Sequence, residues 1–307
     1  MSVTPELLIA GFLAAAVRVA TPLLLAATGE LIAERSGVIN LGIEGAMLAG
    51  ALAAAIGSAA GGPWAGLAAG LAAGVALAVM FALIAIGAGA DQIIAGTAIT
   101  LGAVGLTGAA YHQAFGAAGA GLAIPTFTAI AIPGLAAMPF VGAAFFSQPV
   151  TTYAALVAIP VTWWWLYRTR DGLALRAAGE GAVAARAMGV RVRAVRAGAT
   201  VVAGAFAGVA GASLVLAQVG TFTERMTAGR GFVAIAIVVL GGWRPAGVLL
   251  ASLLFGGAMA LQYVFQAAGL PVPYQLFLML PYVLTLLALA GAARRVHAPA
   301  DLGRALE

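Results

Sequence analysis

Long apolar stretches separated by short polar ones run through the whole chain. Because a transmembrane helix needs about 20 predominantly apolar residues, each long stretch is a candidate span. We predict about nine spans, with eight to ten open, at residues 7–27, 38–60, 64–88, 92–113, 149–167, 197–217, 231–243, 246–267 and 274–291. The seventh stretch is short, so it either begins near Thr221 or forms a half-helix that does not cross alone. The predicted fold class is all-α, a polytopic transmembrane helical bundle forming one domain over residues 1–307.

The composition explains why the bilayer has to be the solvent. Of the 307 residues, 63% are hydrophobic and 8% are charged, with a mean hydropathy of +1.08. Soluble domains contain about 25% charged residues, and this much apolar surface is implausible in a water-soluble globule of the same size. The first apolar stretch follows Met1–Glu6, which carries an acid and no base. A cleaved signal peptide requires a basic start, so we expect this stretch to be retained as a span.

The residue types present exclude several chemistries. The chain has no cysteine, which excludes disulfides, thiolate metal sites and cysteine nucleophiles. His112 and His297 lie far apart in the sequence and form no metal-ligand pattern, so neither a metal nor a cofactor is expected. The chain also lacks lysine, and a phosphate-binding P-loop needs that ammonium group. Any ATP hydrolysis therefore has to come from another subunit.

Positive charge is concentrated in one polar segment, residues 168–196. Its seven basic residues are Arg168, Arg170, Arg176, Arg186, Arg191, Arg193 and Arg196. The positive-inside rule places this segment in the cytoplasm, together with the tail that carries Arg294, Arg295 and Arg304. It also accounts for the net charge of +5 without a nucleic-acid partner. Four predicted spans separate the two segments and five precede the first, so the N-terminus is predicted to lie outside. The outer arginines are also candidates for binding anionic lipid headgroups.

The stretch 114–148 differs from both the spans and the polar segment. It is uncharged and carries Pro125, Pro133 and Pro139, which makes it too interrupted for a straight span and too apolar for a free linker. We predict an extracytoplasmic loop packed on the bundle, with room for a re-entrant piece.

Glycines recur at helical spacing in two of the predicted spans. Gly66, Gly70 and Gly74 share one helical face, and Gly204, Gly208 and Gly211 form a similar stripe. Such faces let helices approach closely in lipid. We expect tight packing here rather than a direct role with substrate.

Polar residues near the starts of two spans are candidates for chemistry. Asn40 and Glu44 are four residues apart, hence on one helical face, and Glu44 lies inside an apolar stretch. A carboxylate at membrane depth faces either a pathway or a structural partner, and Arg18 is the partner considered. Asp91 is expected to cap the next helix, with Gln92 as a candidate for lining a pore. Glu30, Glu34 and Arg35 are expected at the membrane interface.

A second polar run extends from Gln218 through Phe222 to Phe232. On the predicted topology its first part faces outside, where Glu224, Arg225 and Arg230 are the clustered charges. They either form a structural salt bridge or contact an extracytoplasmic partner.

Three runs carry a resemblance that covers almost the whole chain. They are GELIAERSGVINLGIEGAML, GLALRAAGEGAVAARAMGV and VGTFTERMTAGRGFVAIAIVVLGGWRPAGVLLASLLFG. Together they resemble the permease subunit of bacterial nucleoside ABC importers, within the larger group of ribose and branched-chain amino-acid permeases. The second run is typical of the whole group, and the first and third are the more specific. Asp91 departs from the resemblance, since asparagine is common at that position.

The resemblance implies an importer in the bacterial inner membrane, moving substrate by alternating access. Its parts would be two permeases, two cytoplasmic ATPases and an extracytoplasmic substrate-binding protein, the second permease being a paralogue or another copy. The chain itself would be no enzyme. The polar segment would supply a cytoplasmic coupling helix that docks on the ATPase through Arg176, Glu180, Arg186 and Gly189. The candidates for the translocation path are Asn40, Glu44, Gln92, Gln218 and Phe222.

Two other interpretations stay open at this point. The same machinery could carry a pentose or a branched-chain amino acid, because the path residues are not diagnostic. The chain could instead be a secondary transporter driven by protons or sodium, with Glu44 as the titrating acid. An intramembrane enzyme is disfavoured, because the chain has no cysteine and no paired catalytic acids, and only one histidine, His112, in its spans.

Overall fold

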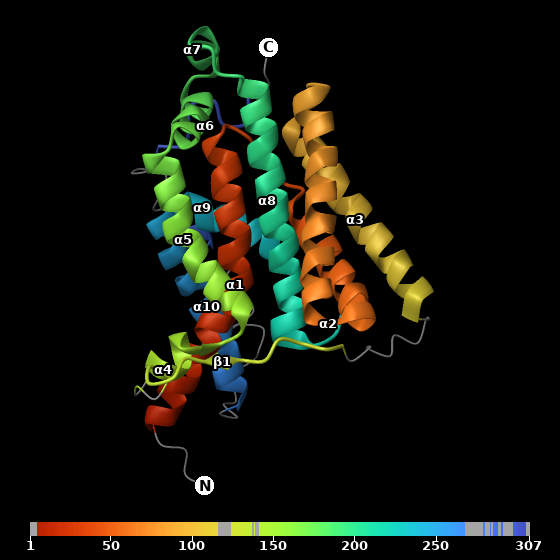
Figure 1. Cartoon of the computed structure of the whole chain (residues 1–307), viewed down its shortest axis with the longest axis vertical. Helices are drawn as coiled ribbons and strands as arrows, with labels where there is room; N and C mark the ends of the chain where they lie inside the picture. Colours follow the sequence, from red (N-terminus) through yellow and green to blue (C-terminus); the bar gives the residue numbers. More distant parts are fainter. Residues whose placement is uncertain are drawn as a thin grey trace.

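The computed structural model describes residues 5–115, 124–136, 138, 141–267 and 297–304, and the isolated residues 279, 283, 285–287 and 290. Helices along the long axis form a bundle, as the sequence predicts (Figure 1). The elements are α1 Pro5–Arg35, α2 Ile43–Phe81, the π-helix η1 Ala82–Gly87, α3 Gln92–Phe115, α4 Val141–Phe145, α5 Val150–Arg168, α6 Arg170–Glu180, α7 Ala182–Ala187, α8 Val192–Leu214, the π-helix η2 Val215–Val219, α9 Arg230–Leu240 and α10 Pro245–Ala267. Strands β1 (Ile130–Ala131) and β2 (Ser147–Gln148) form a small antiparallel ladder.

Most of the predicted spans coincide with these helices. In the described part of the chain, four helices are long and apolar enough to cross a membrane: Ile9–Arg35, Ile43–Gly87, Gln92–Gln113 and Val192–Val219. The predicted spans 149–167 and 246–267 fall on α5 and α10. The predicted span 274–291 lies outside the described residues apart from isolated positions.

Helix α2 is a hairpin of two antiparallel arms rather than one long rod. Gly61 and Gly62 leave the helical conformation, with φ of Gly62 at 82°, and Pro63 starts the second arm, where a missing N–H is harmless. The arms are close: a Cβ on Gly66 would lie 2.6 Å from the carbonyl oxygen of Ala54. The two spans predicted at 38–60 and 64–88 are therefore both present. The first begins later than predicted, at Ile43.

The glycine stripes bring the two arms of α2 and helix α8 into backbone contact. A Cβ on Gly208 would lie 2.2 Å from the carbonyl oxygen of Gly70, and one on Gly204 would lie 2.6 Å from that of Gly74. At Gly211 the clearance is smallest, with the carbonyl oxygen of Met47 at 1.8 Å from the same hypothetical atom. In lipid, the hydrophobic effect does not drive helices together. Close backbone packing of this kind stabilises their association instead. The expectation of tight packing is confirmed.

The two ends of the bundle have different compositions. Helices α6 and α7 lie at one end, and the start of α1, α4 and β1 lie at the other (Figure 1). The described tail residues return to the α6 end, where the Asp301 amide donates to the Gly179 carbonyl and the Gly303 amide to that of Gly37. The arginine-rich segment and the tail thus share one end of the bundle, and residues 124–136 lie at the opposite end, in agreement with the predicted arrangement.

Helix α9 is too short to cross a bilayer. Its 11 residues give a length of about 16 Å, against a hydrocarbon core of about 30 Å. Turns rather than helix precede it, with Arg225 and Ala228 at φ of 56° and 47°. Of the two alternatives for this stretch, the half-helix is the one observed.

Replacing Gly211 with alanine is expected to lower the free energy of unfolding by about 1–3 kcal/mol, because the new methyl group overpacks the contact with Met47. Gly198, on the same helix α8, has nothing within 4 Å of its hypothetical Cβ, so alanine there should be neutral or gain up to about 1 kcal/mol of helix propensity. Thermal unfolding in detergent measures both. Equal effects of the two substitutions would contradict the close contact.

Candidate functional site

Glu44 joins the N-termini of two helices in the interior of the bundle. One carboxylate oxygen accepts hydrogen bonds from the Thr227 hydroxyl (2.6 Å) and the Gly229 amide (2.9 Å), and the other accepts from the Gly231 amide (2.6 Å). The residue lies in the first turn of α2, and Gly231 lies in the first turn of α9. Both helix dipoles favour a negative charge there. The considered pair with Arg18 is not among these contacts, and Glu44 is only 6% exposed.

Asn40 and Gln92 fix the loop between α1 and α2. The Asn40 side-chain oxygen accepts a hydrogen bond from the Gly42 amide (2.9 Å), and the backbone N–H of Asn40 donates to the Glu30 carboxylate (3.1 Å). Gln92 accepts from the Ile39 amide at 2.9 Å. These bonds give both residues a structural role in the loop, and their place in a translocation path stays a prediction.

The acids at the end of α1 are buried inside the protein, and their expected level at the membrane interface stays a prediction. Glu30 and Glu34 are 0% and 2% exposed. The helix continues past the predicted span end to Arg35, and the turn between α9 and α10 covers it. Trp243, in that turn, donates its indole N–H to Glu34 and accepts the Arg35 guanidinium on its carbonyl at 2.8 Å. Arg35 also forms an ion pair with Glu180 at 3.6 Å. The end of α1 thus connects the α6 end with the α9–α10 turn.

The four residues assigned to coupling lie on or just after α6 and α7. Glu180 pairs with Arg35, and the Arg176 guanidinium lies 4.9 Å from the centre of the Tyr167 ring. Arg186 lies in the last turn of α7, and Gly189 follows that helix at a φ of 86°. Three apolar side chains are exposed at this end, and we call them the apolar tips. They are Leu173, Val183 and Met188, which are 60%, 77% and 85% exposed. Two of them, Leu173 and Met188, line a groove of about 660 Å³. Sequence reasoning selected the charged residues here and missed the apolar ones.

The charged run before α9 is divided between two environments. The Glu224 carboxylate lies 2.6 Å from the His112 Nε2 atom on α3, a contact that becomes a salt bridge when His112 is protonated. Arg225 is exposed, whereas Arg230 is partly buried and donates to the Met226 carbonyl at 2.7 Å. A contact of this run with an extracytoplasmic partner stays a prediction.

Of the two remaining path candidates, Phe222 is packed and Gln218 lines an open pocket. Phe222 is 2% exposed, and its ring centre lies 5.3 Å from that of Tyr111. Gln218 donates to the Arg18 carbonyl at 2.7 Å. Arg18, Gln218 and Arg230 line the same pocket, which has a volume of about 450 Å³. The signal that could have identified Arg18 is its charge within the apolar stretch 7–27.

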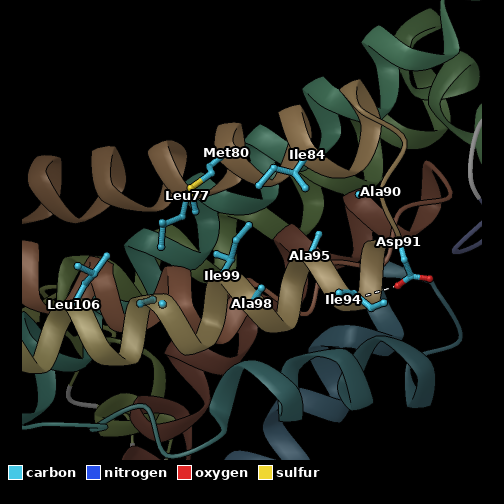
Figure 2. A pocket seen from close by; sticks show the side chains of 12 residues that line it. Leu77, Met80, Ile84, Ala90, Asp91, Ile94, Ala95, Ala98, Ile99 and Leu106 are labelled. Atoms are coloured by element: carbon cyan, nitrogen blue, oxygen red, sulfur yellow. Dashed lines mark hydrogen bonds between the residues drawn. The ribbon is translucent and has the colours of Figure 1, made fainter.

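Asp91 caps α3, as predicted. Its carboxylate accepts the amides of Ile93 and Ile94 at 2.9 Å each. Figure 2 shows it at the end of a groove of about 590 Å³ between α3 and the second arm of α2 with η1. The rest of the lining is apolar, including Leu77, Met80, Ile84, Ile94, Ile99 and Leu106. Such a lining suits lipid or another helix rather than a polar substrate.

These features define a class of membrane protein. Apolar helices of spanning length, a half-helix whose N-terminus meets a buried carboxylate, and a separate polar segment at one end are the parts of a transport subunit. The model of the family described as the permease component of the branched-chain amino acid transport system matches residues 12–289. The chain belongs to this family.

Relatives support the same class over most of the chain. A putative glucose ABC transporter permease, TsgC13 of Haloferax volcanii, is 43% identical over 85% of this chain and 79% of its own. The guanosine ABC transporter permease NupQ of Bacillus subtilis is 35% identical over 91% of both chains. The nucleoside ABC transporter permease NupC of Lactococcus lactis is 31% identical, also over 91% of both. The protein is thus a membrane permease of the ABC transporter type.

Replacing Glu44 with glutamine should lower the free energy of unfolding by about 2 kcal/mol, because an amide loses charge-assisted bonds and sets its NH₂ against a backbone donor. The matched control is Glu224→Gln, whose side chain is 45% exposed and whose ion pair contributes at most about 1 kcal/mol. Thermal unfolding in detergent distinguishes them. The Glu44 clamp is the set of hydrogen bonds from Thr227, Gly229 and Gly231 to the Glu44 carboxylate. A loss of stability in Glu44→Gln no larger than in Glu224→Gln would contradict its stabilising role.

Proposed function

We propose that this chain is the permease subunit of an ATP-driven importer of nucleosides in the bacterial cytoplasmic membrane. The observation that carries the proposal is the similarity over 91% of the chain to a guanosine permease and a nucleoside permease. The runs around Glu44 and Arg230, which are the more specific part of the resemblance, form the clamp between α2 and α9. This supports a common transport core.

A second cargo has support of its own. The relative with 43% identity is a putative glucose permease, which favours a monosaccharide as the alternative substrate. Sugars and nucleosides share hydroxyl groups that hydrogen-bond polar side chains, so the fold alone does not separate them.

The proposed mechanism is alternating access driven from the α6 end. A cytoplasmic ATPase subunit would bind the apolar tips Val183 and Met188 and the groove beside them. Motion of α6 would reach α1 through the Glu180–Arg35 pair, and the α9–α10 turn through the bonds of Arg35 to Trp243. The half-helix α9 is joined to α2 at Glu44, so displacement of its other end would reshape the region around its N-terminus.

The remaining subunits of the transporter are proposed from the similarity to ABC transporter permeases. A second permease, a paralogue or another copy, would complete the path across the membrane. An extracytoplasmic substrate-binding protein would dock at the opposite end, where Glu224 and Arg225 are exposed. Such a protein would supply the affinity, while the permease contacts stay weak enough to release substrate.

The experiment that tests the cargo is uptake of labelled guanosine, adenosine and uridine in cells with and without the gene. Glucose, ribose and leucine in excess serve as competitors. Gene-dependent nucleoside uptake that resists all three competitors is the expected result. Uptake erased by glucose would move the cargo to sugars, and absence of gene dependence would contradict the nucleoside proposal.

Replacing Val183 with aspartate should detach the ATPase subunit, because the new charge would be buried in an apolar contact. We expect co-purification of the ATPase to fall to below about a tenth and uptake to fall with it. The matched control is Ala129→Asp, an exposed position at the other end of the bundle, which should keep the ATPase bound. Full co-purification with Val183→Asp would contradict this docking site.

A further inference from the structure

The pocket that contains Arg18 lies against the spanning helix α1. Helix α1 runs from Pro5 to Arg35, and a span needs about 20 residues, so every window of that length within α1 includes Arg18. The residue is nonetheless exposed on the surface of the chain. A guanidinium within a membrane span is expensive in lipid and is retained where it faces a water-filled cavity or a polar partner.

Four of the nine residues that line this pocket carry side-chain hydrogen-bond donors, and the other five are apolar. Arg18 and Arg230 lie on its wall, with the Thr223 hydroxyl and the Gln218 amide beside them. Leu214 and Met226 add apolar surface. No carboxylate is among the residues that line it.

Contacts around the pocket hold two of its polar side chains, Gln218 and Arg230, in place. Gln218 donates its side-chain amide to the Arg18 carbonyl at 2.7 Å, which leaves the oxygen of that amide as an acceptor. Arg230 is tied to the Met226 carbonyl at 2.7 Å through one nitrogen. Two polar side chains of the pocket are thus preorganised, and its volume of about 450 Å³ lies within the range of about 300–1,000 Å³ for small-molecule sites.

We propose that this pocket is a subsite of the permease for the base of a 6-oxopurine nucleoside, with Arg18 binding the edge formed by O6 and N7. The inference rests on the proposed nucleoside cargo. The planar fork of arginine fits these two adjacent acceptors, and the amide oxygen of Gln218 suits the N1–H of the same base. Adenine presents an NH₂ group in place of O6, so a second donor would face Arg18. The pocket therefore favours guanosine and inosine over adenosine.

The test compares uptake of guanosine with that of 7-deazaguanosine, which lacks the N7 acceptor, by the complete transporter. The substrate-binding protein is the same for every permease variant, so its own preference cancels when variants are compared. We expect the wild type to prefer guanosine, and Arg18→Ala to reduce this preference by about tenfold, the effect of one lost bidentate contact. Arg18→Lys keeps the charge without the planar fork, so it should lose part of this preference and retain more total uptake than Arg18→Ala.

The control is Arg193→Ala, an exposed arginine at the start of α8, at the end of the bundle that carries α6. It should leave the ratio of the two uptakes unchanged. Equal loss of both substrates in the Arg18 variants, with the ratio preserved, would assign Arg18 a structural role and overturn the subsite alone. A wild type that imports glucose or leucine and no nucleoside would overturn the proposed function and the subsite together.

Discussion

The carboxylate of Glu44 is the interaction on which the rest of the transport core depends. It binds two backbone amides at the start of α9 and the Thr227 hydroxyl, while its own backbone begins α2. A half-helix leaves unsatisfied N–H groups at its start, and lipid offers no acceptor for them. Because Glu44 supplies that acceptor from a neighbouring helix, the interrupted segment 220–229 can exist inside a membrane bundle.

A chain of polar contacts leads from this core to the cytoplasmic end proposed for the ATPase. Trp243 closes the α9–α10 turn at a φ of 52°, and both Glu34 and Arg35 bind it. Arg35 continues the chain to Glu180 on α6. Each group in the chain is satisfied by the next, so a shift at one end changes the partners available at the other. Buried polar networks of this kind favour discrete alternative arrangements over gradual deformation.

The sequence predicts the spans, the half-helix and the close glycine packing because each depends on a local pattern of apolar or small residues. The places where it fails depend on tertiary contacts. Glu30 and Glu34 follow the apolar stretch, and their burial in the protein is not apparent from the sequence. Trp243, more than 200 residues away, bonds to Glu34, and the backbone amide of Asn40 bonds to Glu30. Likewise the sequence makes Arg18 a candidate partner for Glu44, but in the structure Arg18 lies beside Gln218 of η2, whose side chain donates to the Arg18 carbonyl. Side-chain direction along α1 decides both outcomes and is not visible in a single sequence.

The near-absence of clearance at Gly211 limits how the protein can move. Helix α8 and the two arms of α2 meet through backbone atoms at Met47, Gly70 and Gly74, where no side chain is available to change rotamer and absorb a shift. Relative motion of these three helical segments is therefore sterically restricted. In the proposed transport cycle, opening and closing would take place by displacement of other helices around this block, which would serve as its fixed frame.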